Sequence, residues 1–192
     1  VLHTTGITLG ISESAAHTAQ RAIELAKDAG WLISFDVNYR AKLWSPAEAR
    51  ERCSLAMEQA DVVFIAARDV VKLFEIRDAD PGVMLEQLAT LFRQATLIMT
   101  RGSEGAVART GEGLVLSQPA FLAEEVERLG GGDAFSAGYL RGYLESGDIA
   151  TALRWGAAVA ALKYTTPGDL PLIDLADVEA LVNGTWGAGV VR

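Results

Sequence analysis

The hydrophobic residues of this 192-residue chain follow two patterns. Short continuous apolar runs, which are typical of buried parallel strands, occur at 31–37 (WLISFDV), 61–65 (DVVFI) and 96–100 (TLIMT). Between these runs, apolar residues recur at helical spacing behind capping residues such as Ser12 and the Ser45-Pro46 pair. The helical stretches predict helices at 15–29, 46–59, 68–74 and 81–94.

The pattern changes in the second half of the chain. Residues 105–117 contain two short apolar runs, AVAR and LVLS, separated by TGEG, which predicts a hairpin. Three further helices are predicted, at 133–144, 149–164 and 174–182. At the start of the chain, residues 1–9 read as a buried strand that enters a loop, as if the sequence begins inside a domain. We find no internal repeat and no linker, so residues 1–192 are expected to form one partial domain.

Alternating strands and helices predict an α/β fold with a doubly wound, mostly parallel sheet flanked by helices. In such a sheet, ligands bind at the carboxyl ends of the strands. Three polar residues follow or end the predicted strands, namely Asn38, Arg40 and Thr100. We therefore expect these three residues to lie at one edge of the sheet, beside a ligand.

Composition narrows the class of ligand. The chain has 17 basic and 25 acidic residues, a net charge of -8 and no basic cluster, so a small molecule is a better partner than a nucleic acid. No apolar run reaches the roughly 20 residues that span a bilayer, and the single cysteine, Cys53, fits a reducing compartment. We expect a cytoplasmic protein without membrane anchoring. The common P-loop, dinucleotide, zinc and Ser-His-Asp motifs are absent from the sequence.

The stretch LGGGDAFSAG places three glycines directly before Asp133 at the start of a predicted helix. The helix N-terminus presents backbone N–H groups and positive dipole charge, and glycines let an anion approach that backbone. A carboxylate there suits a neighbouring hydroxyl whose proton it accepts. The pattern is that of phosphoryl transfer, with a base beside an anion hole. The alternative is a structural aspartate N-cap after a glycine-rich turn.

Three motifs occur in the order in which they stand in one known family. LGGGDAFSAGYLRGYL resembles the G-A-G-D signature of the ribokinase-like, or PfkB, family of carbohydrate kinases. FDVNYRAKLW is similar to a segment of that family's 2-keto-3-deoxygluconate kinase branch, and TRGSEGAVA lies between the two. The resemblance covers essentially the whole chain, aligned with the C-terminal two thirds of a family member. It implies a ribokinase-like fold, ATP and Mg²⁺ as cofactors, and a sugar or sugar acid as substrate.

The resemblance also implies residue roles. Asp133 matches the family's catalytic base, which also contacts the substrate. Arg40 and Asp169 match substrate-binding positions. The family's anion hole corresponds to Gly130, Gly131 and Gly132. Arg40 suits a carboxylate or a phosphate, because the guanidinium fork pairs with either anion. The implied nucleotide-binding residues are Asn38, Tyr39, Arg40, Thr100, Arg101, Gly102, Ser103, Glu104 and Gly105.

The sequence departs from the family pattern at several positions. Glu127, Arg128 and Gly131 replace the aspartate, threonine and alanine of Asp-Thr-x-Gly-Ala-Gly-Asp, and the extra glycine adds backbone freedom that must be lost. The Asn-x-x-Glu motif linked to magnesium is missing, which leaves the metal ligands unknown and Asp69 as a candidate substitute. The first strands of the sheet and the small β lid of relatives have no counterpart in these residues. If the 192 residues are the entire polypeptide, we expect an open site with weak activity or none.

Three functions stay open at this point. The first is phosphorylation of 2-keto-3-deoxygluconate, and the second is another PfkB-type activity, such as that of a fructokinase or ribokinase. The third is a noncatalytic nucleotide-binding remnant, which the altered motifs would suit. Relatives often dimerise through the lid, which this chain is expected to lack, and a homo-oligomer stays an open alternative.

Overall fold

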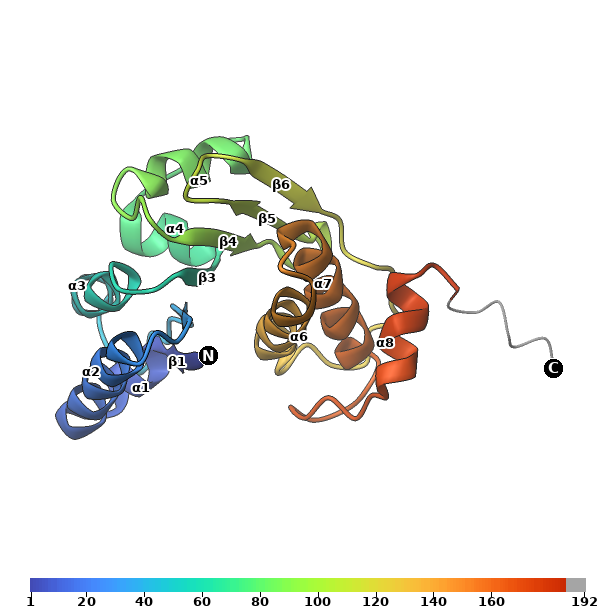
Figure 1. The fold of residues 1–192 in the computed structure, drawn as a ribbon, viewed down its shortest axis with the longest axis horizontal. Helices are drawn as coiled ribbons and strands as arrows, with labels where there is room; N and C mark the ends of the chain where they lie inside the picture. Colours follow the sequence, from blue (N-terminus) through green and yellow to red (C-terminus); the bar gives the residue numbers. More distant parts are fainter. Residues whose placement is uncertain (186–192) are drawn as a thin grey trace. The chain divides into compact units, whose positions relative to one another are not determined.

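The computed structural model describes residues 1–185, which pack as two compact units. Unit 1 comprises Val1–Arg101 and Val107–Leu116, and unit 2 comprises Gly102–Ala106 and the chain from Ser117 onward. The strands are β1 (Leu2–Thr5), β2 (Ile33–Asp36), β3 (Val62–Ala66), β4 (Thr96–Thr100), β5 (Ala106–Arg109) and β6 (Val115–Gln118). Figure 1 draws these strands and the helices between them, and labels most of them.

Helices separate most of the strands. In unit 1 they are α1 (Gly6–Ile11), α2 (Glu13–Asp28), α3 (Pro46–Met57), α4 (Ala67–Phe74) and α5 (Pro81–Ala89). In unit 2 they are the short 3₁₀ helix η1 (Gly102–Glu104), α6 (Gly131–Ser146), α7 (Ile149–Tyr164) and α8 (Leu175–Val182). The helix predicted at 81–94 ends earlier, at Ala89.

The six strands form one sheet in the order β1-β2-β3-β4-β5-β6. Neighbours among β1 to β4 run parallel, so that Thr5 lies beside Asp36 and Ala66 lies beside Thr100 at their carboxyl ends. Asn38 follows β2 and Thr100 ends β4, which confirms the predicted placement of both residues at this edge. The helix-flanked sheet confirms the predicted α/β, ribokinase-like fold class.

Apolar burial and capping explain the helices of unit 1. Side chains such as Ile23 of α2 and Leu85 of α5 are fully buried in a core that also contains Phe35. Ser45 forms a capping box at the start of α3, where its Oγ accepts from the Glu48 N–H and the Glu48 carboxylate accepts from the Ser45 N–H. These local signals are the ones that the sequence predicted.

Cys53, on the inward face of α3, has no exposed surface. Burial raises the pKa of its thiol to about 12, and the nearby carboxylates of Asp36 and Asp69 act in the same direction. Cys53 is therefore a small buried residue of the hydrophobic core.

The start of the chain differs from its prediction. Only Leu2–Thr5 is a strand, and Gly6–Ile11 forms a helix instead of a loop. Two glycines and β-branched residues give this segment a low helix propensity. Tertiary packing stabilises it, because Leu9 enters the core and Gly10 lies against the Trp44 ring.

Two long helices, α6 and α7, lie side by side in unit 2 (Figure 1). Glycines allow this close contact, because a Cβ on Gly138 or Gly142 would come within 3 Å of Trp155. At the end of α7, Lys163 is fully buried, and its Nζ donates to the Thr166 carbonyl at 3.0 Å. None of the helices within residues 1–185 combines the length and the hydropathy that crossing a bilayer requires.

Candidate active site

The glycine turn, defined here as residues Glu127–Asp133, leads into α6. Its Gly130 is the N-cap of the helix and has φ 75°, a conformation that strongly favours glycine. A Cβ on Gly130 would also lie only 2.4 Å from the Asp169 carbonyl oxygen. The structure thus brings the backbone of Asp169, a predicted substrate-binding residue, next to Gly130 of the predicted anion hole.

The three glycines have different surroundings. Gly131 is buried, and a Cβ on it would lie 2.2 Å from Cε1 of Tyr164. Gly132 is exposed, and a Cβ there would meet no described atom within 4 Å. Packing therefore accounts for the first two glycines, whereas the third leaves the helix backbone open to a ligand.

Asp133 is the third residue of α6 and lies exposed in its first turn. Because Gly130 is the N-cap, the alternative interpretation of Asp133 as a structural N-cap is wrong. The helix macrodipole favours a negative charge in the first turn. Asp133 is consequently an accessible carboxylate beside backbone N–H groups, which is the arrangement that a base next to an anion hole requires.

Hydrogen bonds link the glycine turn and the residue before it to the end of α7 and to the loop that follows. The Glu127 carboxylate accepts from the Gly168 N–H at 2.8 Å. The Tyr164 carbonyl accepts from the N–H groups of Val126 and Glu127, at 2.8 and 3.2 Å. The extra methylene that glutamate has over the family's aspartate is thus used to reach the backbone of this loop.

The predicted nucleotide-binding residues at 100–105 form a tight turn. Thr100 ends β4, η1 follows, and the Gly105 N–H donates to the Gly102 carbonyl at 3.1 Å. Gly105 has φ 87°, and a Cβ on it would lie 2.1 Å from the Gln118 carbonyl oxygen. The turn keeps Gly102, Ser103 and Glu104 exposed.

The N-Y-R turn, defined as Asn38–Arg40, follows β2 in unit 1. Asn38 has φ 38°, which is unusual for a residue with a side chain. Its N–H donates to Oδ1 of Asp36 at 3.0 Å, and the N–H of Tyr39 donates to the Asp69 carboxylate. Two buried carboxylates therefore hold this turn, a role that the sequence analysis did not assign to Asp36 or Asp69.

The side chains of the N-Y-R turn point to different environments. Tyr39 is buried, donates from its hydroxyl to the Trp44 carbonyl at 3.3 Å and lies under the Lys72 ammonium, 5.4 Å from the ring centroid. Arg40 is exposed, although one guanidinium nitrogen donates to the Tyr39 carbonyl at 3.2 Å. The turn consequently presents Arg40 as a cation for an anionic ligand.

Asp69 is only 4% exposed, and burial raises the pKa of its carboxyl despite the nearby charges of Arg68, Arg40 and Lys72. Its contact with Tyr39 makes it a support for the N-Y-R turn and a poor replacement for an exposed metal ligand. Within residues 1–185, no three His, Cys, Asp or Glu side chains are grouped as a protein-built metal site requires.

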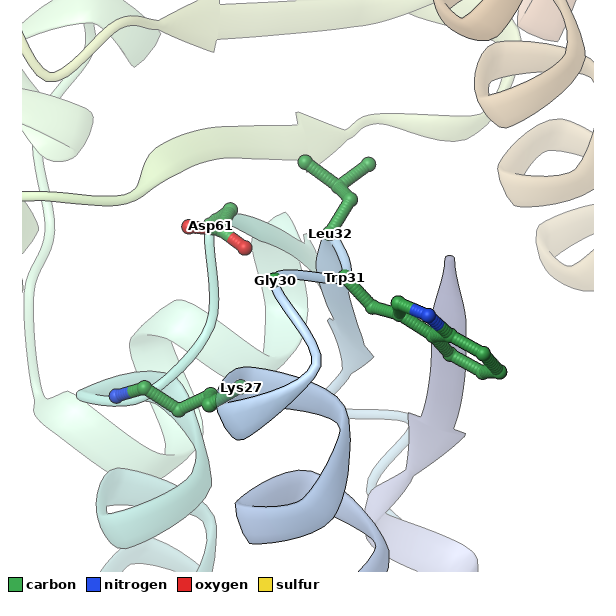
Figure 2. Close-up of a pocket in the computed structure, with 5 residues that line it drawn as sticks. All are labelled: Lys27, Gly30, Trp31, Leu32 and Asp61. Atoms are coloured by element: carbon green, nitrogen blue, oxygen red, sulfur yellow. The ribbon is translucent and has the colours of Figure 1, made fainter.

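A separate surface hollow of about 440 Å³ lies at the opposite ends of the strands (Figure 2). Asp61, one of its lining residues, accepts from the Ile33 N–H at 2.7 Å and so links the starts of β2 and β3. Lys27 and Trp31 extend away from each other in Figure 2. The hollow contains none of the predicted site residues and does not focus its polar groups on one point.

Solved structures share this fold. A fructokinase from Vibrio cholerae O395, in its fructose, ADP and calcium ion bound form, matches with a TM-score of 0.84 and 26% identity, over 94% of this chain and 60% of its own. A 2-dehydro-3-deoxygluconokinase from Thermotoga maritima matches with a TM-score of 0.78 and 25% identity, over 95% of this chain and 59% of its own.

Sequence comparison identifies the family, whereas the structural matches above show the fold. The pfkB family of carbohydrate kinases matches residues 1–174, and the chain belongs to this family. A 2-dehydro-3-deoxygalactonokinase from Haloferax volcanii is 40% identical over 190 residues, which cover 99% of this chain and 59% of the relative. The predicted family is thus confirmed, and the chain spans a little under two thirds of the length of these relatives.

Proposed function

We propose that this chain carries the phosphoryl-transfer site of an ATP-dependent kinase whose acceptor is a 2-keto-3-deoxy sugar acid, most specifically 2-keto-3-deoxygluconate. The observation that carries the proposal is the exposed Asp133 in the first turn of α6, directly after the open backbone of Gly132. Relatives that act on such acids in both comparisons support the substrate class.

In the proposed reaction, the Asp133 carboxylate accepts the proton of the acceptor hydroxyl. The hydroxyl oxygen forms a bond to the γ-phosphorus of ATP while the bond from that phosphorus to the bridging oxygen breaks, and ADP leaves. Backbone N–H groups in the first turn of α6 stabilise the charge on the transferred phosphoryl oxygens. We assign the turn at 100–105 and the N-Y-R turn to the nucleotide.

Arg40 provides the reason for preferring an acidic sugar. Its exposed guanidinium pairs with a carboxylate through two parallel hydrogen bonds, and a neutral sugar offers no such partner. Asp169, whose backbone touches Gly130, is assigned to substrate hydroxyls. Both assignments depend on the proposed substrate class.

Mg²⁺ is proposed to accompany ATP and to shield its phosphates. Mg²⁺ usually keeps several water ligands and binds through one or two carboxylates and the substrate phosphates, so it needs no cage made of protein alone. Among the described residues no three such side chains are grouped, so the protein ligands of Mg²⁺ stay unassigned.

The test is a steady-state assay of the purified chain with ATP and Mg²⁺ against 2-keto-3-deoxygluconate, its galactonate epimer, fructose and ribose. We expect turnover of the acids and loss of about 10²–10⁴-fold in kcat for Asp133→Asn, with ADP affinity retained. Asp177→Asn is the matched control, because Asp177 lies in the first turn of α8 in the same unit. Equal activity of Asp133→Asn and the wild type would sink the base assignment.

A second arm separates the alternatives. Arg40→Gln is expected to raise KM for the acids by about 10-fold or more, through loss of a charge-assisted pair, without changing KM for a neutral sugar. Turnover of fructose alone would favour the fructokinase alternative, which the Vibrio structure supports. Nucleotide binding without turnover of any sugar would identify a remnant.

A further inference from the structure

We propose that Tyr164 is a positioning residue of the candidate active site, and that its aromatic ring sets the first turn of α6 by packing on Gly131. The inference rests on the proposed function, because the turn that it positions carries Asp133. Tyr164 lies at the last position of α7, outside every motif that the sequence analysis used. No local pattern points to it, since the two residues in contact are 33 positions apart along the chain.

The conformation of Gly131 does not require glycine. Unlike Gly130, it is not among the residues with positive φ, and it begins a regular helix. Alanine at such a position would ordinarily stabilise the chain, because it restricts the unfolded state. The reason for glycine is therefore the neighbouring side chain.

The Tyr164 ring occupies the space of the missing side chain. A Cβ on Gly131 would lie 2.2 Å from Cε1 of Tyr164 and 2.7 Å from both Cζ and the phenolic oxygen. Such contacts are well inside van der Waals distance, so the ring and a methyl group exclude each other. Gly131 and Tyr164 form a matched pair, and the middle glycine of the GGGD sequence is a steric requirement.

The backbone of Tyr164 is held in place by hydrogen bonds. Its carbonyl accepts from the N–H groups of Val126 and Glu127. The next residues are fixed by Lys163, whose buried ammonium donates to the Thr166 carbonyl. The ring that packs on Gly131 is therefore carried by a hydrogen-bonded backbone.

This support has a consequence for the site. Gly131 lies between the left-handed Gly130 and the exposed pair Gly132 and Asp133, so a fixed Gly131 also fixes the direction of the next N–H groups and of the carboxylate. Donors act on a transition state only if they are already in place. A displacement of about 1 Å can reduce a rate about 10²-fold.

The first test is a thermal-unfolding cycle of the whole chain with Gly131→Ala, Tyr164→Ala and the double variant. We expect Gly131→Ala to lower Tm by about 3 °C or more, because it overpacks a closed site. The double variant should be more stable than the sum of the single effects predicts. Gly132→Ala is the control with the same chemical change, and it should keep Tm or raise it by up to about 4 °C, because its Cβ meets no described atom and alanine restricts the unfolded chain.

The second test uses kinetics. Tyr164→Ala should lower kcat by about 10-fold or more while KM for ATP stays within about 2-fold, and Tyr164→Phe, which keeps the ring, should retain kcat. If Tyr164 had a purely structural role, its replacement would change Tm without lowering kcat at an unchanged KM for ATP.

The two tests decide the proposal separately. The steric pairing of Gly131 with Tyr164 is overturned if Gly131→Ala is as stable as the wild type. It is also overturned if the effects of the two single substitutions simply add in the double variant. Unchanged kcat in Tyr164→Ala overturns the positioning role alone. A wild-type chain that neither turns over nor binds ADP overturns that role together with the proposed function, and the melting cycle then still decides the pairing.

Discussion

The N-Y-R turn and the glycine turn hold their exposed groups by opposite means. In the N-Y-R turn, buried carboxylates of Asp36 and Asp69 accept from the backbone N–H groups of Asn38 and Tyr39. In the glycine turn, shape decides, because the Asp169 carbonyl and the Tyr164 ring occupy the places where side chains would be. The N-Y-R turn therefore depends on buried acceptors. The glycine turn also has a hydrogen bond to the Glu127 carboxylate, but at Gly130 and Gly131 it depends on the absence of methyl groups.

This difference predicts different sensitivities. Removing the Asp36 or Asp69 acceptor should disturb the N-Y-R turn, whereas it leaves the close packing at Gly130 and Gly131 in place. Adding one carbon atom should have the reverse effect. Single substitutions in each turn can test this contrast by stability measurements alone.

The largest effect is expected from Gly130→Ala. The substitution forces alanine into a left-handed conformation and directs its Cβ toward the Asp169 carbonyl oxygen at 2.4 Å. We expect a loss of about 2–4 kcal/mol in the free energy of unfolding, measured by urea denaturation.

Gly147→Ala is the control, because Gly147 has φ 68° at the end of the same helix, and a Cβ there would have no described neighbour within 4 Å. It should cost about 1 kcal/mol from the backbone conformation alone. If Gly130→Ala and Gly147→Ala were equally stable, the contact of Gly130 with Asp169 would not contribute to the stability of the glycine turn.

A smaller effect is expected from Asp36→Ala in the N-Y-R turn. It removes the acceptor of the Asn38 N–H, and a donor left without its partner costs about 1–3 kcal/mol. Asp36→Asn keeps an acceptor oxygen at the same place and should recover most of this loss. Urea denaturation of the two variants checks the prediction, and an asparagine variant as unstable as the alanine variant would contradict it.

The smallest effect is expected from Asp69→Asn, and it depends on pH. Burial raises the folded-state pKa of Asp69 above its ordinary value of 3.8, so the folded chain keeps this proton at a pH where the unfolded chain releases it. The stability that this group contributes is therefore greatest below pH 3.8 and falls as the pH rises through the raised pKa.

Asparagine cannot titrate but can still accept from the Tyr39 N–H, so it should remove this fall. We expect the Tm of Asp69→Asn to exceed that of the wild type by about 2 °C at pH 7 and the difference to shrink toward pH 4. Melting curves across this range provide the measurement. A Tm difference that does not change with pH would show that Asp69 is not the titrating group.

Local signals predicted much of the fold. The run at 96–100 is a strand with the predicted bounds, and the helix at 149–164 also has them. Ser45-Pro46 starts α3 because the capping box needs only residues three positions apart. The helix at Gly6–Ile11 was missed, because packing rather than propensity stabilises it.

The candidate site was only partly predictable for the same reason. Asp133 and the glycines form a continuous motif, so their chemistry could be inferred from neighbours in sequence. Tyr164 acts on Gly131 from another helix, and Asp69 reaches Tyr39 from α4. Such contacts join distant parts of the chain and leave no periodic or local mark.

Cys53 gives the chain a practical property for fluorescence work. It is the only cysteine in the sequence, and its thiol, buried and with a pKa of about 12, is almost entirely protonated at pH 8, so thiolate-directed dyes should not react with it. A cysteine introduced at the exposed Ala137, one helical turn after Asp133, would then be the sole labelled position. A dye at that position would test whether nucleotide approaches α6 as proposed, without a signal from any other cysteine.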